Sequence, residues 1–406
     1  MRTLAVLSLH TSPLAQPGTG DSGGMNVYVR ELVSSLAQAG VACTVYTRRW
    51  SDDLPGVVEV EPGFRVVHVD AGAHDVPKDR LPELVDEFTE GVLTELRSTC
   101  DVDAIHANYW LSGVAGHRLK HELEVPLVST FHTLARVKAE TGDAEPERRV
   151  QAEHDVMDCS DAITASCAAE AQQLVELYGA APERIQLVPP GVIHAFFSPG
   201  DRRGARTALG YGLDGSPMLL FVGRIQPLKG LDVAIGALAE LRSKHAQLVV
   251  VGGPSGPDGE AEAAKASLLA EELGVADRIR WIEPQPHHLL ATYYRAADVC
   301  VVPSRSESFG LVALEAAACG TPVVAAAVGG LRTLVEDGET GSLVEDRQPD
   351  GFARAVDALL ADPAKARAMS RAAATRARGY TWSTTAARLR RLYADLTARQ
   401  PVDCNA

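Results

Sequence analysis

The sequence alternates short apolar segments with helical patterns in two successive series, and this alternation is the feature that most constrains the fold. The first series predicts strands at residues 3–10, 42–48, 64–71, 103–109, 126–132, 162–166 and 185–189. The second predicts strands at 218–224, 247–251, 278–282, 299–303 and 322–327. Strands that alternate with helices form doubly wound parallel sheets. We therefore expect an α/β protein with two Rossmann-like doubly wound domains that face each other across a cleft.

A proline-rich break at 188–191 separates the two series. A chain of 406 residues is too long for one core, which agrees with two domains. The expected boundaries are 1–195 for the N-terminal domain and 210–378 for the C-terminal domain, with a connector between them. Ligands of such two-lobed proteins usually bind between the lobes.

The net charge of −14 argues against nucleic acid and anionic membranes as partners. No apolar run reaches about 18 residues, so no membrane span or stable membrane insertion is expected. The apolar N-terminus is too short for a signal peptide and is interpreted as the first strand. The seven cysteines are scattered and include no C-x-x-C pair, so they do not match the ligand spacing of a zinc site. They predict reduced thiols and a cytoplasmic chain.

Residues 299–326 combine a buried strand, a polar loop and an Ala-rich helix that starts at Gly310. Glu307 lies in the loop and Glu315 in the helix, at the carboxyl end of a strand, where open parallel sheets bind ligands. The helix N-terminus suits an anion or an electron-rich oxygen. On this spacing alone, two ordinary surface acids are an equally good interpretation.

The loop at residues 10–26 is rich in glycine and proline and follows the first strand. It contains neither G-x-G-x-x-G nor a Walker lysine, so it does not predict an NAD or ATP site.

Arg224 and Lys229 lie in one loop after a strand of the second series, in the sequence G-R-x4-K-G. Two cations at that edge can neutralise a diphosphate and stabilise the charge that develops on it as a leaving group. Alone, the pair could equally be two solvated cations.

Together, G-R-x4-K-G at 223–230 and E-S-F-G-L-x3-E at 307–315 resemble the retaining glycosyltransferases of family 4, which have the GT-B fold. The likeness covers nearly the whole chain. Within the family, the loop H-T-S-P-L-A-Q-P-G-T-G-D-S-G-G-M-N-V-Y-V at 10–29 is similar to members that transfer N-acetylglucosamine from UDP-GlcNAc to 1D-myo-inositol 3-phosphate, the first step of mycothiol biosynthesis. The resemblance implies an enzyme of this kind, a hexosyltransferase that uses a UDP-sugar and retains the anomeric configuration. It also implies that the last helix, 380–400, returns to the N-terminal domain.

The resemblance implies catalytic and donor-binding residues at matching positions. The catalytic residues would be Arg224, Lys229, Glu307 and His132. The donor would contact Gln16, Pro17, Gly24, Arg224, Lys229, Gln285, Glu307, Phe309, Gly310, Leu311 and Glu315. In this assignment Arg224 and Lys229 hold the diphosphate, while Glu307 contacts the sugar and Glu315 the ribose.

The resemblance also implies an acceptor site and a structural metal. The acceptor, a phosphorylated cyclitol, would contact His10, Asp21, Ser22, Gly23, Gly24, Met25, Asn26, Lys78, Tyr109, Thr133 and Arg149. Some relatives hold a metal with backbone oxygens, and the matching residues are Tyr294, Arg295, Ala297 and Thr321. Mg²⁺ there would be structural, and no cofactor is expected for catalysis.

Three positions depart from the family pattern: Asn108 replaces a histidine, Gln285 replaces an arginine near the base, and Lys138 is followed by Ala-Glu140 where an asparagine is usual. Two of them lie on the acceptor side, so the acceptor remains open. Alternatives are a sucrose-phosphate synthase-like enzyme, an aminocyclitol GlcNAc transferase and, in another class, a non-catalytic UDP-sugar binding protein. The adjacent His287 and His288 lack metal-ligand partners in the sequence and are interpreted as surface residues. A homodimer is an expectation that the sequence leaves open.

Overall fold

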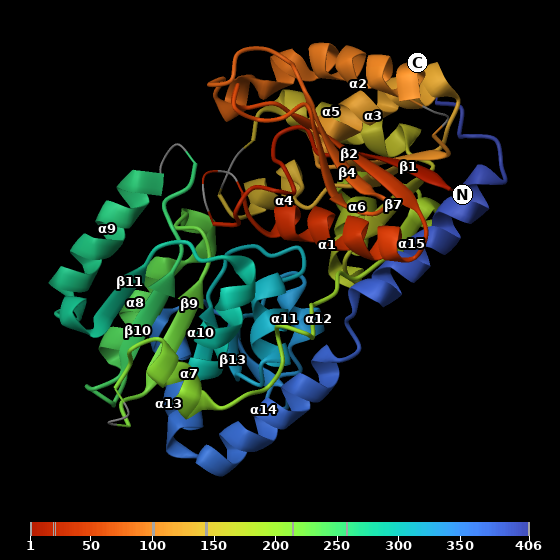
Figure 1. The fold of residues 1–406 in the computed structure, drawn as a ribbon. Helices are drawn as coiled ribbons and strands as arrows, with labels where there is room; N and C mark the ends of the chain where they lie inside the picture. The colour runs from red at the N-terminus through yellow and green to blue at the C-terminus, as the bar shows by residue number, and fades with distance from the viewer. Residues whose placement is uncertain are drawn as a thin grey trace. The chain divides into compact units, whose positions relative to one another are not determined.

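The computed structural model describes residues 2–18, 20, 22–99, 102–142, 145–212, 215–256 and 259–404. The chain forms two compact units (Figure 1). Unit 1 contains residues 1–15, 25–190 and 382–406, and unit 2 contains residues 16–24 and 191–381. They differ from the expected domains chiefly at residues 16–24, which belong to unit 2 although they precede most of unit 1 in the sequence.

Unit 1 is built on an eight-stranded sheet with the order β3-β4-β2-β1-β5-β6-β7-β8. Its strands are β1 (Thr3–Leu7), β2 (Ala42–Arg48), β3 (Val57–Glu61), β4 (Phe64–Val69), β5 (Ala104–Asn108), β6 (Leu127–Thr130), β7 (Ala162–Ala165) and β8 (Ile185–Leu187). Every neighbouring pair is parallel except β3 and β4. The sheet is flanked by α1 (Gly24–Gln38), η1 (Lys78–Leu84), α2 (Val85–Thr99), α3 (Trp110–Leu123), α4 (Ala135–Glu140), α5 (Glu147–Cys159), α6 (Ala168–Tyr178), η2 (Pro182–Arg184) and α15 (Trp382–Thr397).

Unit 2 is built on a six-stranded sheet with the order β11-β10-β9-β12-β13-β14, all of it parallel. Its strands are β9 (Met218–Val222), β10 (Gln247–Val251), β11 (Ile279–Ile282), β12 (Val299–Val302), β13 (Val323–Ala326) and β14 (Gly341–Val344). Its helices are α7 (Arg202–Ala208), η3 (Pro227–Lys229), α8 (Leu231–Glu240), α9 (Gly259–Glu272), η4 (Ala276–Arg278), η5 (His287–Leu289), α10 (Leu290–Ala296), α11 (Leu311–Ala318), α12 (Leu331–Leu334), α13 (Pro349–Ala361) and α14 (Pro363–Ala377).

The expected strands are all present, and the structure adds β3 and β14. The residues of β3 are exposed or half-buried, and this strand pairs antiparallel with β4 at the edge of the sheet. Strand β14 has only four residues and contains Gly341 and Ser342, so its apolar signal is weak. Both lie at sheet edges, where a strand does not need the continuous apolar run of a buried strand.

The central strands are buried because helices cover both faces of each sheet. Strand β12, for example, has the sequence Val-Cys-Val-Val, and all four of its residues are buried. Among the described helices, none is both long and apolar enough to cross a membrane.

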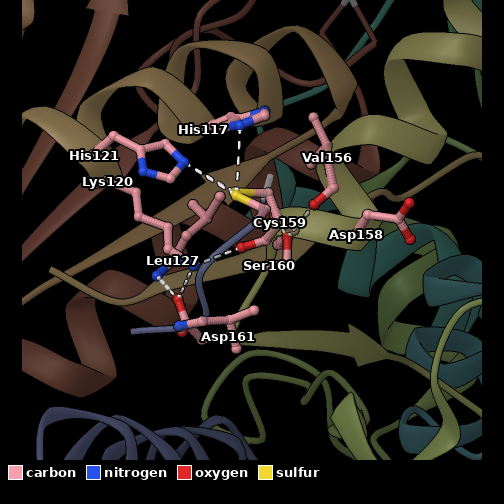
Figure 2. The surroundings of a disulfide bond; sticks show 12 residues. His117, Lys120, His121, Leu127, Val156, Asp158, Cys159, Ser160 and Asp161 are labelled. Atoms are coloured by element: carbon pink, nitrogen blue, oxygen red, sulfur yellow. Dashed lines mark hydrogen bonds and ion pairs between the residues drawn. A yellow bond between two sulfur atoms is a disulfide. The ribbon is translucent and has the colours of Figure 1, made fainter. Parts of the chain in front are cut away.

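The expectation that every cysteine is a reduced thiol is wrong for one pair. Cys159, at the end of α5, and Cys404, after α15, form a disulfide 245 residues apart in sequence (Figure 2). Cys43, Cys167, Cys300 and Cys319 are free and buried, and Cys100 lies outside the described residues. The pairing depends on where α15 and the following segment lie, which cysteine spacing does not encode.

Helix α15 is fixed to the sheet of unit 1 by a buried polar contact. The Nδ1 atom of His106, on β5, lies 2.6 Å from the Tyr393 hydroxyl, and its Nε2 atom lies 2.7 Å from the Thr130 hydroxyl. Burial lowers the pKa of His106 to about 3. The ring is therefore neutral, and one nitrogen donates while the other accepts.

This histidine makes the stability of unit 1 dependent on pH. Its folded pKa lies below its unfolded pKa of about 6.5, so its contribution is complete above pH 6.5 and is lost as the pH falls toward 3. At pH 5 the loss from this one group is about 2 kcal/mol. His106→Gln should remove that part of the pH dependence, measured from urea unfolding followed by hydrogen exchange of unit 1 peptides.

The matched control is His154→Gln, because the side chain of His154 is 44% exposed. Between pH 7 and pH 5 this variant should lose as much free energy of unfolding as the wild type. Equal pH dependence in His106→Gln and wild type would contradict the assignment.

Candidate functional site

The two halves of the unit 2 site meet where the strand order of the sheet reverses. Strand β9 lies between β10 and β12: the chain first builds β10 and β11 on one side of β9 and then β12, β13 and β14 on the other. Arg224 and Lys229 follow β9, and Glu307 follows β12. Such a reversal leaves a crevice at the carboxyl ends of the strands, where open α/β sheets bind ligands.

Lys229 and Glu307 form an ion pair at this edge of the sheet, and both are half-buried. The Ser304 hydroxyl donates a second hydrogen bond to the same Glu307 carboxylate over 3.0 Å. Gly230 shapes this corner, because its φ is +70° and a Cβ there would overlap the carbonyl oxygen of Pro303. A lysine ammonium has three donors, so it can hold an incoming anion while it remains beside Glu307.

Glu315 lies inside α11, only 5% exposed, and its partners come from the protein itself. Its Oε1 lies 2.6 Å from His287 Nε2, and its Oε2 accepts a hydrogen bond from the Tyr294 hydroxyl over 2.9 Å. Burial raises the pKa of Tyr294 well above its ordinary value, so that hydroxyl keeps its proton and donates. The interpretation of His287 as an ordinary surface residue is therefore wrong: it supports Glu315. Each carboxylate oxygen keeps a further lone pair for a ligand hydroxyl.

The glycine-rich loop reaches the unit 2 site although it follows the first strand of unit 1. Gln16 donates to the Pro284 carbonyl over 2.8 Å, and a Cβ on Gly23 would lie 3.1 Å from Arg224 Nε. The Ser255 hydroxyl donates to the Gly20 carbonyl and accepts from Arg224 over 3.4 Å. The loop thus holds Arg224 on one side.

Other predicted contacts of the unit 2 site are placed as follows. A Cβ on Gly24 would lie 3.5 Å from Leu311. Phe309 is buried against Tyr380, Gly310 has a φ of +99° at the start of α11, and Gln285 donates to the Glu283 carbonyl over 2.9 Å. Pro17 is half-buried in the loop.

Two glycines that the sequence analysis did not single out set the position of the Glu307 loop. The amide of Gly330 donates to the Glu307 carbonyl over 2.9 Å. A Cβ on Gly330 would overlap Phe309 Cα and the Ser308 carbonyl oxygen, and one on Gly329 would overlap the Glu307 carbonyl oxygen. Only residues without a side chain allow the two backbone segments to come this close.

The predicted metal-binding oxygens lie at the C-terminal end of α10. The Thr321 hydroxyl donates to the Tyr294 carbonyl over 2.6 Å, and the Ala297 amide also reaches that carbonyl, over 3.2 Å. The Arg295 side chain bonds to the Ser198 carbonyl over 2.8 Å. An all-oxygen set suits Mg²⁺ or Ca²⁺. Hydrogen bonds already satisfy the Tyr294 carbonyl, however, and the metal stays a prediction.

Unit 1 also reverses its strand order, between β1 and β5, and predicted residues follow both strands and the next one. The rings of His10, after β1, and Tyr109, after β5, lie 4.4 Å apart. Tyr109 has a φ of +76°, and His132, after β6, has a φ of +62°. Backbone strain of this kind costs about 1–3 kcal/mol and concentrates at functional sites.

His132 is oriented by the residue that departs from the family pattern. Its Nε2 lies 2.9 Å from Asn108 Oδ1, and because an amide oxygen accepts, that nitrogen donates. Burial lowers the pKa of His132 to about 3, so the imidazole is neutral. Its ring also packs edge-on against Tyr28 at 4.9 Å.

Arg149 is buried beside two of the predicted acceptor residues, Thr133 and Tyr109. It donates to the Thr133 hydroxyl over 3.1 Å, and its guanidinium lies 5.1 Å from the centre of the Tyr109 ring. Two carboxylates pair with it, Glu153 and Glu145, each at 2.8 Å. Burial alone would lower the pKa of Arg149, but Tyr109 and these two acids raise it.

Lys138 joins the same group through Glu145, with which it forms an ion pair. The Glu145 carboxylate thus bridges two cations, Lys138 and Arg149. The position between these two cations suits an anion. Lys78 is exposed at the start of η1, which α5 contacts through a 2.7 Å hydrogen bond from Arg148 to the Asp79 carbonyl.

The remaining predicted acceptor residues divide between the units. Asn26 donates to the Thr11 hydroxyl over 2.6 Å and so fixes the start of the loop in unit 1, where Met25 is half-buried. Ser22, Gly23 and Gly24 belong to unit 2. Asp21 lies outside the described residues.

Two family models match the chain: Glycosyl transferase 4-like domain at residues 23–191 and Glycosyl transferases group 1 at residues 211–376. A D-inositol 3-phosphate glycosyltransferase of Streptosporangium roseum is 48% identical over 97% of this chain and 93% of its own length. The enzyme of that name from Geodermatophilus obscurus is 49% identical over 95% and 87%.

Solved structures show the same GT-B fold. A sucrose-phosphate synthase of Thermosynechococcus elongatus has a TM-score of 0.92 and 34% identity, and the match covers 98% of this chain and all of that one. Anabaena HepE in complex with UDP and glucose has a TM-score of 0.79 at 18% identity, with 98% and 100% covered.

A methyl group on Gly330 tests the close approach behind the Glu307 loop. Gly330→Ala should lower the free energy of unfolding of unit 2 by about 1–3 kcal/mol, because the Glu307–Phe309 backbone must move. Hydrogen exchange of a peptide spanning 304–311 should rise at the same time. Gly379→Ala is the control, since a Cβ there comes no closer than 3.4 Å to any atom; equal effects of the two substitutions would contradict the prediction.

Proposed function

Since this chain belongs to the family 4 glycosyltransferases, which include its D-inositol 3-phosphate glycosyltransferase relatives, we propose that it transfers N-acetylglucosamine from UDP-GlcNAc to 1D-myo-inositol 3-phosphate. The identity of 48% over nearly the full length of both chains carries the proposal. The reaction would be the first step of mycothiol biosynthesis, in the cytoplasm.

The unit 2 site supports the donor half of the proposal. Arg224 and Lys229 provide positive charge at the carboxyl end of β9, where the diphosphate of a UDP-sugar would lie. Glu315, held by His287 and Tyr294, offers fixed acceptor oxygens to the ribose hydroxyls. Glu307 would bind hydroxyls of the transferred sugar beside Lys229.

The proposed chemistry is a front-face substitution. The bond between the anomeric carbon and the diphosphate oxygen breaks, and the acceptor hydroxyl forms the new bond on the same face. The departing diphosphate takes the acceptor's proton, and Arg224 and Lys229 stabilise its negative charge. No covalent sugar–enzyme bond is required, because Glu307 is occupied by Lys229 and Ser304 and acts as a binding group.

The unit 1 site supports a phosphorylated acceptor. Glu145 shows that Lys138 and Arg149 can hold a common anion, and the acceptor phosphate would compete for these cations. His132, neutral and fixed by Asn108, would offer a hydrogen bond without adding charge. Lys78 would complete the phosphate site from η1.

A sucrose-phosphate synthase-like reaction is the second candidate, because a solved enzyme of that name shares 34% identity. A matrix of UDP- and GDP-sugars against inositol 3-phosphate, inositol, fructose 6-phosphate and 2-deoxystreptamine, read by mass spectrometry, separates the candidates. We expect product from UDP-GlcNAc and inositol 3-phosphate. Turnover only with another acceptor would reject the proposal, and UDP-sugar binding without any turnover would indicate a binding protein.

Lys229→Ala should lower the turnover number by about 100- to 1000-fold, because the leaving diphosphate loses a preorganised cation. UDP release with saturating substrates is the measurement. The control is Lys265→Ala, which removes an exposed lysine of α9 that pairs with Glu262. Near-normal turnover in Lys229→Ala would remove this residue from the mechanism.

Lys78→Ala should lower kcat/KM for inositol 3-phosphate by about 10- to 100-fold, the loss of one charge-assisted hydrogen bond of about 1.5–3 kcal/mol. Slow transfer to unphosphorylated inositol should not change. Arg80→Ala, two residues away and exposed, is the control. Lys78 is a sharper test than Arg149, whose removal would also leave the fully buried Glu153 without its cation. An equal loss with both acceptors would contradict a role in phosphate binding.

A further inference from the structure

Four side chains with metal-ligand chemistry gather in unit 1, apart from the residues assigned to sugar transfer. His117 and His121 lie on α3, and Cys159 ends α5 (Figure 2). Cys404 follows α15. One ligand atom from each lies within 4.8 Å of all the others. The two histidines are four residues apart, which places them on the same face of the helix.

The nitrogen–sulfur distances of 3.3 and 3.7 Å match a tetrahedral zinc site, and the distance of 3.0 Å is slightly shorter. His121 Nε2 lies 3.0 Å from Cys404 Sγ and 3.3 Å from Cys159 Sγ, and His117 Nε2 lies 3.7 Å from Cys404 Sγ. In a tetrahedral zinc site with bonds of about 2.0–2.3 Å, neighbouring ligand atoms are about 3.3–3.8 Å apart. The two sulfur atoms are bonded to each other in this structure, so an ion requires their reduction first.

Contacts other than the sulfur–sulfur bond hold the cluster together. The Asp161 carboxylate accepts hydrogen bonds from the amides of Val402 (2.6 Å) and Leu127 (2.7 Å), and it pairs with Lys120 at 2.9 Å. Lys120 also donates to the Cys159 carbonyl over 2.7 Å. The backbone beside Cys404 and Cys159 is therefore fixed next to α3 even when the disulfide is open.

We propose that, with both cysteines reduced, His117, His121, Cys159 and Cys404 form a structural Zn²⁺ site. Opening the disulfide takes two electrons, which a phosphine supplies, and two protons, which come from the water molecule whose oxygen forms the phosphine oxide. Zn²⁺ then displaces the two thiol protons and binds both thiolates and the Nε2 lone pairs of two neutral imidazoles. All four positions are filled by protein ligands, so the site links the C-terminal segment to α3 and α5 and has no open position for catalysis.

The test measures zinc on the full chain. Protein reduced with a phosphine in the absence of oxygen is mixed with Zn²⁺, passed through gel filtration and analysed by mass spectrometry of the metal. We expect about one zinc per chain in the wild type and none in Cys404→Ser or His121→Ala. Cys43→Ser and His154→Ala are matched controls, because both residues lie in unit 1 outside the cluster, and they should retain zinc.

Co²⁺ gives a second readout that depends on geometry. The reduced wild type should show the visible bands of tetrahedral Co²⁺ and a thiolate charge-transfer band, and the oxidised protein should show neither. Three results would overturn the proposal: reduced wild type without zinc, which would leave a plain disulfide; equal zinc in Cys404→Ser; or octahedral Co²⁺ without thiolate absorption. None of these results depends on whether the sugar transfer proposed above is correct.

Discussion

The reversal of strand order in each sheet is the constraint on which the rest of the structure depends. In unit 2 the reversal lies between β9 and β12, and in unit 1 it lies between β1 and β5. Parallel strands direct all their carboxyl ends to one edge, so the loops after these strands share that edge whatever their sequence separation. Lys229 meets Glu307 in this way, and His10 meets Tyr109.

Glycine backbones then allow the loops to come closer than side chains would permit. Gly329 and Gly330 lie against Glu307–Phe309, and Gly23 lies against Arg224. The polar groups brought together there are paired in advance. Lys229 is neutralised by Glu307, and Glu145 lies between Lys138 and Arg149. Such pairing limits the cost of burying charges before a ligand binds.

Much of the fold follows from the sequence, because buried parallel strands need continuous apolar runs and the helices between them need an apolar face. Edge strands β3 and β14 carry neither signal strongly and were not expected. At the site, Arg224, Lys229, Glu307 and Glu315 were predicted from their spacing and their family resemblance. Their partners Ser304, Ser255, His287 and Tyr294 were not assigned as partners, since a serine or histidine in a loop has no distinguishing pattern until its neighbour is known.

The sequence by itself determined two doubly wound sheets, the loops that carry the chemistry and the family of the enzyme, because these depend on local periodicity and on short motifs. Only the tertiary structure decided which residues from distant segments touch. It placed residues 16–24 in unit 2, gave Glu315 its partners, and brought Cys404 to Cys159 and two histidines. The sequence predicted no zinc site because its ligands are separated by up to 287 positions. That distance along the chain is closed by the packing of α15 and its following segment, and spacing rules describe only ligands held within one local loop.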